Sequence, residues 1–334
     1  MECCRPWTDS PAIRYGDVSL IDAFEPLTRG RCCGTRPPSG ARIWSYSCAH
    51  EQFTQDRGVV VSRFEVGSPA WYEVAVDGPD IVMSFPGFAV FVFSAEQDAI
   101  RGYPERDTTA LTMSHLLLDQ VMPLLLAGAG HHILHASAVS VTVGEATSAL
   151  VLLGDSGAGK SSTAYAASEV GADFLADDFV VVAEHGGRPS LARVDHRGAR
   201  LWEESVSGLE PALLSERVSQ HNSKRRVAVT SRPAPDTLPV LAVLTLEKRL
   251  PPGTAPTLEP MKPLGTTMRL LHHSFRLDPT DRVAQELTLD ASARLAKAVP
   301  GFEVRMPADL RGLRSACRIL LEKVLASVSE APIR

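Results

Sequence analysis

Residues 154–161 read Gly154-Asp155-Ser156-Gly157-Ala158-Gly159-Lys160-Ser161, a complete G-x-x-x-x-G-K-[ST] phosphate-binding loop (P-loop). An apolar run, 149–153, precedes it, and a stretch of helical composition, 162–167, follows it. Glycine is needed where a loop turns its backbone N–H groups towards an anion, because a Cβ would block the close approach. Since the motif has the strand and the helix that it requires, this stretch predicts a nucleotide triphosphate site.

Each part of this loop has an expected task. Lys160 is expected to reach the β- and γ-phosphates, and the Ser161 hydroxyl is expected to bind Mg²⁺. The following helix would direct the positive end of its dipole at the phosphates. The fragment G-D-S-G also occurs in serine proteases, but Ser156 fits the phosphate loop better, so we interpret it as a loop residue. The residues expected to bind ATP are Gly154, Asp155, Ser156, Gly157, Ala158, Gly159, Lys160, Ser161 and Ser162.

The whole chain has the composition of an ordinary globular protein. With 334 residues it exceeds the size at which one core usually stops growing, so we expect a β-rich N-terminal domain, 1–107, and a P-loop nucleotide-binding domain, 108–334. Its net charge of −5 gives no electrostatic footprint for nucleic acid. The expected partners are therefore a nucleotide and a small molecule, peptide or protein, and a homo-oligomer is left open.

The cysteines and the apolar segments bear on the cellular compartment. None of the six cysteines forms a C-x-x-C pair or a zinc-site spacing, so reduced thiols are expected. The N-terminus carries an acid and has no apolar core of a signal peptide. The most apolar window, 116–129, is expected to form a buried helix rather than a membrane span. A cytoplasmic protein without a membrane partner is the expectation.

Patterning along the chain predicts an α/β protein. Strands are expected in the N-terminal part, then a helix over 108–127, and then two strands, 133–143 and 149–153, joined as a hairpin. Residues 183–260 have the composition of short strands, and an amphipathic helix with apolar residues from Leu310 to Leu325 closes the chain. The expected N-terminal strands are 59–61, 71–76, 81–84 and 89–93.

Two adjacent acids, Asp177 and Asp178, interrupt the apolar strand predicted over 174–182. Unpaired buried carboxylates cost several kcal/mol, so the pair indicates a strand end that faces cations, either Mg²⁺ or lysine. In a continuous strand the two would point to opposite faces, whereas at a strand end both reach the loop. The alternative is that one or both leave the strand into solvent. His135 is interpreted either as a hydrogen-bonded core residue or as a partner that orients Asp177.

The order His135-Ala136-Ser137-Ala138-Val139, then the loop 154–161, then Ala176-Asp177-Asp178 resembles the HPr kinase/phosphorylase superfamily. The resemblance covers roughly residues 110–325. It implies a twisted mixed sheet related to the phosphoenolpyruvate carboxykinase core, and ATP-dependent phosphorylation of a hydroxyl. It also implies that Asp177 takes the proton of the acceptor hydroxyl, that Asp178 lies next to Mg²⁺ and that His135 supports Asp177. Lys160 completes the expected catalytic set.

The chain departs from this family after the paired acids. The R-G-x-G-I-I signature is absent, and the nearest segment is Arg200-Leu201-Trp202-Glu203-Glu204-Ser205, so phosphorolysis and the HPr substrate are not implied. The layout is closer to HPr-kinase-like proteins of peptide natural-product pathways, which implies a serine of a peptide or protein as the acceptor. Alternatives are a small-molecule hydroxyl kinase and a non-catalytic nucleotide-binding regulator. Lys224, Arg225 and Arg226 could supply a further cation, and Glu203 a further metal ligand.

Overall fold

The computed structural model shows a mixed α/β protein with a β-rich N-terminal region and several mixed sheets. Its contacts define two compact units: unit 1 comprises 1–129, 219–222 and 276–285, and unit 2 comprises 130–218, 223–275 and 286–334. The predicted domain division at residue 107 stays a prediction, because a domain is also defined by independent folding. The structure describes residues 12–15, 18–22, 42–49, 51–54, 58–65, 71–192, 194, 198–209, 215–229 and 235–329.

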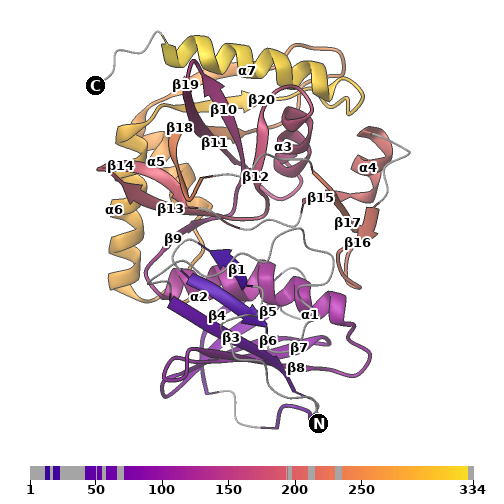
Figure 1. Ribbon diagram of the computed structural model, residues 1–334, viewed down its shortest axis with the longest axis vertical. Coiled ribbons are helices and arrows are strands. Elements are labelled where there is room, and N and C mark those ends of the chain that lie inside the picture. Colours follow the sequence, from indigo (N-terminus) through magenta and orange to yellow (C-terminus); the bar gives the residue numbers. More distant parts are fainter. Residues whose placement is uncertain are drawn as a thin grey trace. The chain divides into compact units, whose positions relative to one another are not determined.

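An eight-stranded sheet forms most of unit 1, in the order β1-β2-β3-β8-β7-β6-β5-β4. Strand β3 lies parallel to both of its neighbours, and the other pairs are antiparallel. All four predicted N-terminal strands are present as β4 to β7 (Figure 1). The strands are β1 (Ala12–Tyr15), β2 (Val18–Asp22), β3 (Arg42–Cys48), β4 (Val59–Phe64), β5 (Tyr72–Asp77), β6 (Asp80–Phe85), β7 (Ala89–Ser94) and β8 (Ala99–Pro104).

A long helical segment follows this sheet in unit 1, as α1 (Ala110–Leu116), the π-helical turn η2 (Leu117–Val121) and α2 (Met122–Gly128). The hydroxyl of Thr109 accepts a hydrogen bond from the Thr112 N–H at 3.3 Å and caps its start. By length and composition alone the segment could cross a membrane, but 78% of its apolar window is buried inside the protein. The buried helix expected from the sequence is therefore confirmed.

A nine-stranded mixed sheet is the centre of unit 2, in the order β12-β10-β11-β18-β14-β13-β9, with β20 paired to β18 and β19 paired to β20. Strands β10 and β11 form the predicted antiparallel hairpin, and β18 runs parallel to β11. The strands are β9 (His132–Leu134), β10 (Ser137–Val143), β11 (Ala146–Leu153), β12 (Asp173–Ala176), β13 (Val180–His185), β14 (Arg188–Ala192), β18 (Thr237–Leu246), β19 (Thr257–Met261) and β20 (Gly301–Arg305).

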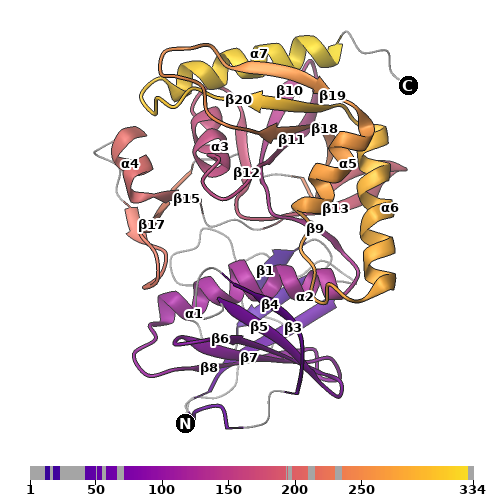
Figure 2. The ribbon, with the colours of Figure 1, turned by 180° about the vertical axis from the view of Figure 1, so that it is seen from behind.

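Both faces of this sheet are covered, as Figures 1 and 2 show. Successive residues of β11 alternate between two apolar clusters: Leu150 and Leu152 face one, while Val151 and Leu153 face the other. The first cluster includes residues of α3 (Lys160–Ser168) and α7 (Leu313–Ser329), and the second includes residues of α5 (Pro263–His272) and α6 (Arg282–Ala298). The loop after β11 therefore leaves from a strand that is fixed on both sides.

The structure differs from the predicted elements in four places. The predicted strand 133–143 is two strands, β9 and β10, and the predicted strand 174–182 is broken at Asp177 and Asp178 into β12 and β13. Residues 183–260 include a helix, α4 (Glu203–Leu209), beside a small sheet in the order β15-β17-β16. Helices α5 and α6 were not predicted. The small sheet consists of β15 (Ala199–Trp202), β16 (Ser215–Arg217) and β17 (Lys224–Val227).

The expectation of reduced thiols concerns two of the described cysteines: Cys48 is the last residue of β3, and Cys317 is buried on α7. Burial raises the pKa of the Cys317 thiol to about 12. Cys3, Cys4, Cys32 and Cys33 lie outside the described residues, so the expectation for them stays a prediction.

Candidate functional site

The loop 154–161 connects β11 to α3, in the strand, loop and helix order that its sequence predicts. Three of its glycines have positive φ angles: +149° at Gly154, +82° at Gly157 and +102° at Gly159. Only glycine adopts such conformations without strain, so the glycine positions follow from the path of the backbone. Gly159 also stands at the N-cap of α3, and no side chain caps this end of the helix. The helix start therefore keeps its N–H groups for other acceptors.

Lys160 is buried, with 7% of its surface exposed. Its ammonium donates to the carbonyl oxygen of Gly154 at 2.6 Å and to that of Asp155 at 3.4 Å. Burial lowers the pKa of Lys160, while the nearby carboxylates of Asp178 and Asp177 act in the opposite direction. The amine thus lies over the loop, where an anion held by the loop would be within its reach.

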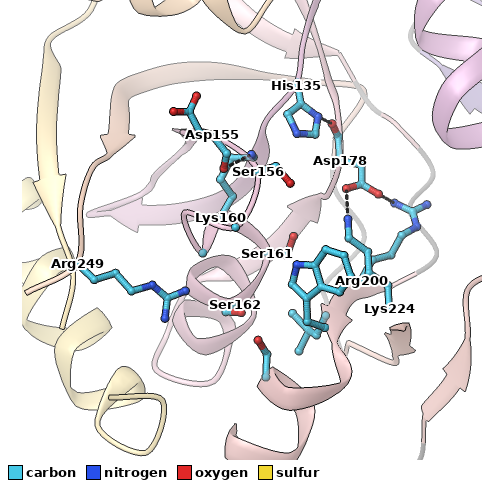
Figure 3. A pocket seen from close by; sticks show the side chains of 15 residues that line it. His135, Asp155, Ser156, Lys160, Ser161, Ser162, Asp178, Arg200, Lys224 and Arg249 are labelled. Carbon is cyan, nitrogen blue, oxygen red and sulfur yellow. Dashed lines mark hydrogen bonds and ion pairs between the residues drawn. The ribbon is translucent and has the colours of Figure 1, made fainter. Parts of the chain in front are cut away.

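A pocket of about 480 Å³, including its opening to solvent, lies beside this loop (Figure 3). Of the nine residues predicted to bind ATP, all but Gly154 and Ala158 line it. Four cations and two carboxylates contribute to its wall, so cations outnumber acids by two. Such an excess favours an anionic ligand. The charged residues are Asp155, Lys160, Asp178, Arg200, Lys224 and Arg249.

Asp178 is the member of the acidic pair that lines the pocket. Its carboxylate accepts a hydrogen bond from Arg200 Nη1 at 3.0 Å and lies 3.5 Å from the Lys224 ammonium. The φ angle of Asp178 is +68°, so the chain turns sharply where β12 has ended. The expectation of a strand end that faces cations agrees with this arrangement.

Asp177 points elsewhere. Its Oδ1 accepts from the Ser137 hydroxyl at 2.7 Å, and its Oδ2 accepts from the backbone N–H of Arg200 at 2.8 Å. It is buried and is not part of the pocket wall. At a strand end both acids were expected to reach the loop, but only Asp178 lines the pocket, because the turn at Asp178 separates the two side chains.

His135 contacts Asp178 rather than Asp177. Its Nδ1 lies 2.8 Å from the backbone carbonyl oxygen of Asp178, so the ring nitrogen donates there. The expected support of the Asp177 carboxylate by His135 is therefore corrected: the ring holds the turn that carries Asp178. Burial, and next the positive charge of Lys160, lower the pKa of His135 to about 4. The ring is neutral at physiological pH.

Lys224 is the residue of the basic run 224–226 that reaches the pocket. The Asp178 carboxylate raises its pKa, and its ammonium lies 5.5 Å from the centre of the Trp202 ring. Arg225 is instead paired with Glu203, and neither of these two lines the pocket. The position of Glu203 thus gives no support to a role as metal ligand.

Five pocket residues received no role from the sequence: Arg200, Leu201, Trp202, Ser205 and Arg249. Arg249 follows β18, whose parallel pairing with β11 brings the ends of both strands to one edge of the sheet. The guanidinium of Arg249 lies so close to the loop that a Cβ added to Gly159 would be 3.0 Å from Nη2 of Arg249. Adjacent parallel strands commonly share a binding edge, so this pairing was the signal that could have found Arg249.

Comparisons with known proteins add little to this geometry. No family model matches the chain, and no curated protein matches it. Among solved structures, the Hpr(Ser) kinase/phosphatase from Coxiella burnetii aligns with 58% of this chain and 94% of its own, at 10% sequence identity and a TM-score of 0.27. A TM-score this low does not show a common fold, so the function has to be inferred from the site itself.

Proposed function

We propose that the protein is an ATP-dependent kinase that transfers the γ-phosphate to a hydroxyl, namely that of a serine in a peptide or protein. One observation carries this proposal: the glycine-rich loop, the Lys160 ammonium and the Asp178 carboxylate line a single pocket with a surplus of cations. A polyphosphate needs the loop and the cations, whereas transfer to a hydroxyl also needs a carboxylate near the terminal phosphate.

The residues around the loop fit the parts of such a reaction. Backbone N–H groups of the loop and the start of α3 would hold the phosphates, and Lys160 would offset the charge that develops on the departing β-phosphate. Arg249 and Lys224 supply further positive charge at the pocket wall. Ser161 offers a hydroxyl oxygen on this wall, which suits Mg²⁺. When bound, Mg²⁺ would neutralise charge on the phosphate oxygens.

The transfer step can be written with its proton. The acceptor oxygen forms a bond to the γ-phosphorus while the bond between this phosphorus and the bridging oxygen of ADP breaks, and the hydroxyl proton passes to a carboxylate. We infer that Asp178 is the better placed of the two acids, because Asp177 accepts hydrogen bonds from Ser137 and Arg200 on both of its oxygens. The role of Asp177 as base, which the sequence resemblance implies, remains the competing assignment.

A regulatory nucleotide-binding protein without transfer activity is the second candidate. It is favoured by the engagement of both acids, since Arg200 and Lys224 contact the Asp178 carboxylate while Ser137 and Arg200 hold Asp177. A protein that only senses ATP needs the loop and the cations but no available base. Turnover separates the two candidates.

Binding of MgATP is the first test, measured by calorimetry on the full chain. Lys160→Ala should weaken binding at least about tenfold, because it removes a charge-assisted contact to the phosphates. Lys248→Ala is the matched control: this lysine is exposed next to Arg249 but does not line the pocket, so its loss should leave the affinity unchanged. Equal affinities of wild type and Lys160→Ala would contradict the nucleotide site.

Transfer is the second test, with ATP labelled at its γ-phosphate and a cell extract separated into peptides, proteins and small molecules. Asp178→Asn should lower transfer by about 10²-fold or more while MgATP still binds. Asp177→Asn with the same loss, and Asp178→Asn without it, would restore the competing assignment. Binding without transfer to any fraction would support the regulatory protein, and label in small molecules alone would support a metabolite kinase.

A further inference from the structure

Asp155, His272 and His273 form a cluster at the edge of the loop 154–161. Each offers one donor atom, and these three atoms all lie within 4.8 Å of one another. The Nε2 of His272 is 3.2 Å from Oδ1 of Asp155. The two imidazole rings stand nearly perpendicular, with their centroids 4.8 Å apart.

The end of α5 brings these histidines together. His272 is the last residue of α5, and His273 is its C-cap with a ψ of 6°, so the chain leaves the helical path between them. The carbonyl oxygen of His273 accepts from the backbone N–H of His135 at 2.7 Å, which anchors this turn to the chain between β9 and β10. His273 itself is buried, with 7% of its surface exposed. One donor of the cluster is thus held in place by the fold.

The donor set has a chemical preference. Two imidazoles and one carboxylate suit Zn²⁺ and related transition-metal ions, whereas Mg²⁺ prefers oxygen donors and water. In a tetrahedral zinc site with bonds of about 2.1 Å, donor atoms lie roughly 3.4 Å apart. The pair of His272 and Asp155 already has this spacing. Their side chains are 64% and 81% exposed, so both can move the remaining distance towards His273.

We propose that Asp155, His272 and His273 bind one divalent transition-metal ion of the zinc class, with a fourth position open to water or an anion. An ion pair between His272 and Asp155 would explain why these two side chains lie together, but it would not explain why the donor atom of His273 lies beside them. Because Asp155 follows Gly154 in the loop, and its carbonyl oxygen contacts the Lys160 ammonium, a bound ion would restrain the loop next to this lysine. The metal would thus couple the end of α5 to the phosphate-binding loop.

The test uses metal-free full-length protein without nucleotide, so its outcome does not depend on kinase activity. Co²⁺ titration should give the visible bands of a tetrahedral ion with nitrogen and oxygen donors, and Zn²⁺ should displace it at one ion per chain. His272→Gln and Asp155→Asn should each weaken this binding at least about tenfold, since even outer contacts of a metal site contribute that much. His185→Gln is the matched control, because His185 is an exposed histidine at the end of β13.

Thiolate charge-transfer bands in place of this spectrum would show that cysteines bind the ion, and would overturn the proposal. Affinities unchanged by both variants would overturn it as well, provided that circular dichroism shows the variants folded. His273→Gln, which alters the buried member, should give the same loss as His272→Gln. Failure of these tests leaves the proposed nucleotide site untouched, since the Lys160→Ala experiment examines that site with MgATP.

Discussion

Asp178 has a backbone conformation that few residues other than glycine adopt, with a φ of +68°. Aspartate tolerates this region better than most residues, and here the turn places its carboxylate beside Arg200 and Lys224. Asp178 and Arg200 are both buried, so each charge depends on its partner. Strain at one residue and burial of a charge pair thus meet at the pocket, as they often do at functional sites.

Loss of one partner should show this dependence. Arg200→Met removes a buried cation from the Asp178 carboxylate, so we expect the free energy of unfolding to fall by about 3–5 kcal/mol. The double variant Arg200→Met with Asp178→Asn should be no less stable than Arg200→Met, because the uncompensated charge is gone. Urea unfolding of the four proteins measures the coupling. Additive losses would show that the two side chains act independently.

The loop glycines allow a sharper comparison. Alanine at Gly157 would meet no atom within 4 Å, so only the strain of its +82° φ angle counts, about 1 kcal/mol. Alanine at Gly154 would bring its Cβ to 2.9 Å from the Leu246 carbonyl oxygen, which is backbone and cannot move away. Gly154→Ala should therefore destabilise the protein more than Gly157→Ala in thermal unfolding. The reverse order would mean that the loop relaxes around residue 154.

The sequence could predict most loop residues at the pocket because a phosphate loop is contiguous and its glycines are required by the local backbone conformation. Asp178 could be predicted from local sequence as well, because a carboxylate within an apolar run is unusual. Arg200 and Arg249 are far from the loop in sequence. The parallel pairing of β18 with β11 brings Arg249 to it, and hydrogen bonds to Asp177 and Asp178 hold Arg200 there. The partner of His135 could not be predicted, because it depends on the turn at Asp178.

At the scale of elements, the spacing of apolar residues predicted a helix correctly where only one of its faces is buried. The apolar residues of α7 face the core as predicted, with Leu313, Cys317, Leu320 and Val324 buried. Strands β10 and β11 were recognised as a hairpin from their turn residues. The strand predicted over 133–143 was wrong in extent, because apolar character is continuous through His135 while the chain passes from β9 to β10 there. Hydrophobicity alone does not mark such a change of strand partners.

Helix α7 offers a direct test of this burial pattern. Leu320→Ala removes a side chain that is 2% exposed in the cluster between α7, α3 and the sheet, so we expect a loss of about 2–5 kcal/mol. Ile319, one position earlier, is 37% exposed and serves as the control, with an expected loss well below that of Leu320→Ala. Chemical denaturation measures both. Similar losses at the two positions would contradict the assigned face.

At the scale of the whole molecule, buried histidines should make stability depend on pH. Burial is the main cause that lowers the pKa of His132 and of His135 from 6.5 to about 4. As the pH falls below about 6.5, the unfolded chain gains protons on these rings while the folded protein does not. The free energy of unfolding should therefore fall between pH 6.5 and pH 4, by at most roughly 3 kcal/mol for each ring.

Urea midpoints at several pH values measure this loss. His132→Gln should flatten the pH dependence, because His132 is only 8% exposed and its Nε2 lies within hydrogen-bond distance of the Ser274 and Ser292 hydroxyls. His185→Gln, at an exposed histidine, should leave the slope as it is in the parent protein. A midpoint that stays constant from pH 7 to pH 4.5 would show that neither buried ring resists protonation.

The chain passes between its two units five times, because 219–222 and 276–285 belong with the N-terminal strands although their neighbours in sequence do not. Within unit 1, the ring of His221 lies 4.6 Å from that of Trp71 and 5.1 Å from that of His115. Removal of residues 1–129 would therefore deprive 219–222 and 276–285 of the residues that they pack against. Neither unit can be exchanged with that of another protein by a single cut in the chain, so experiments on the loop 154–161 should keep the complete polypeptide.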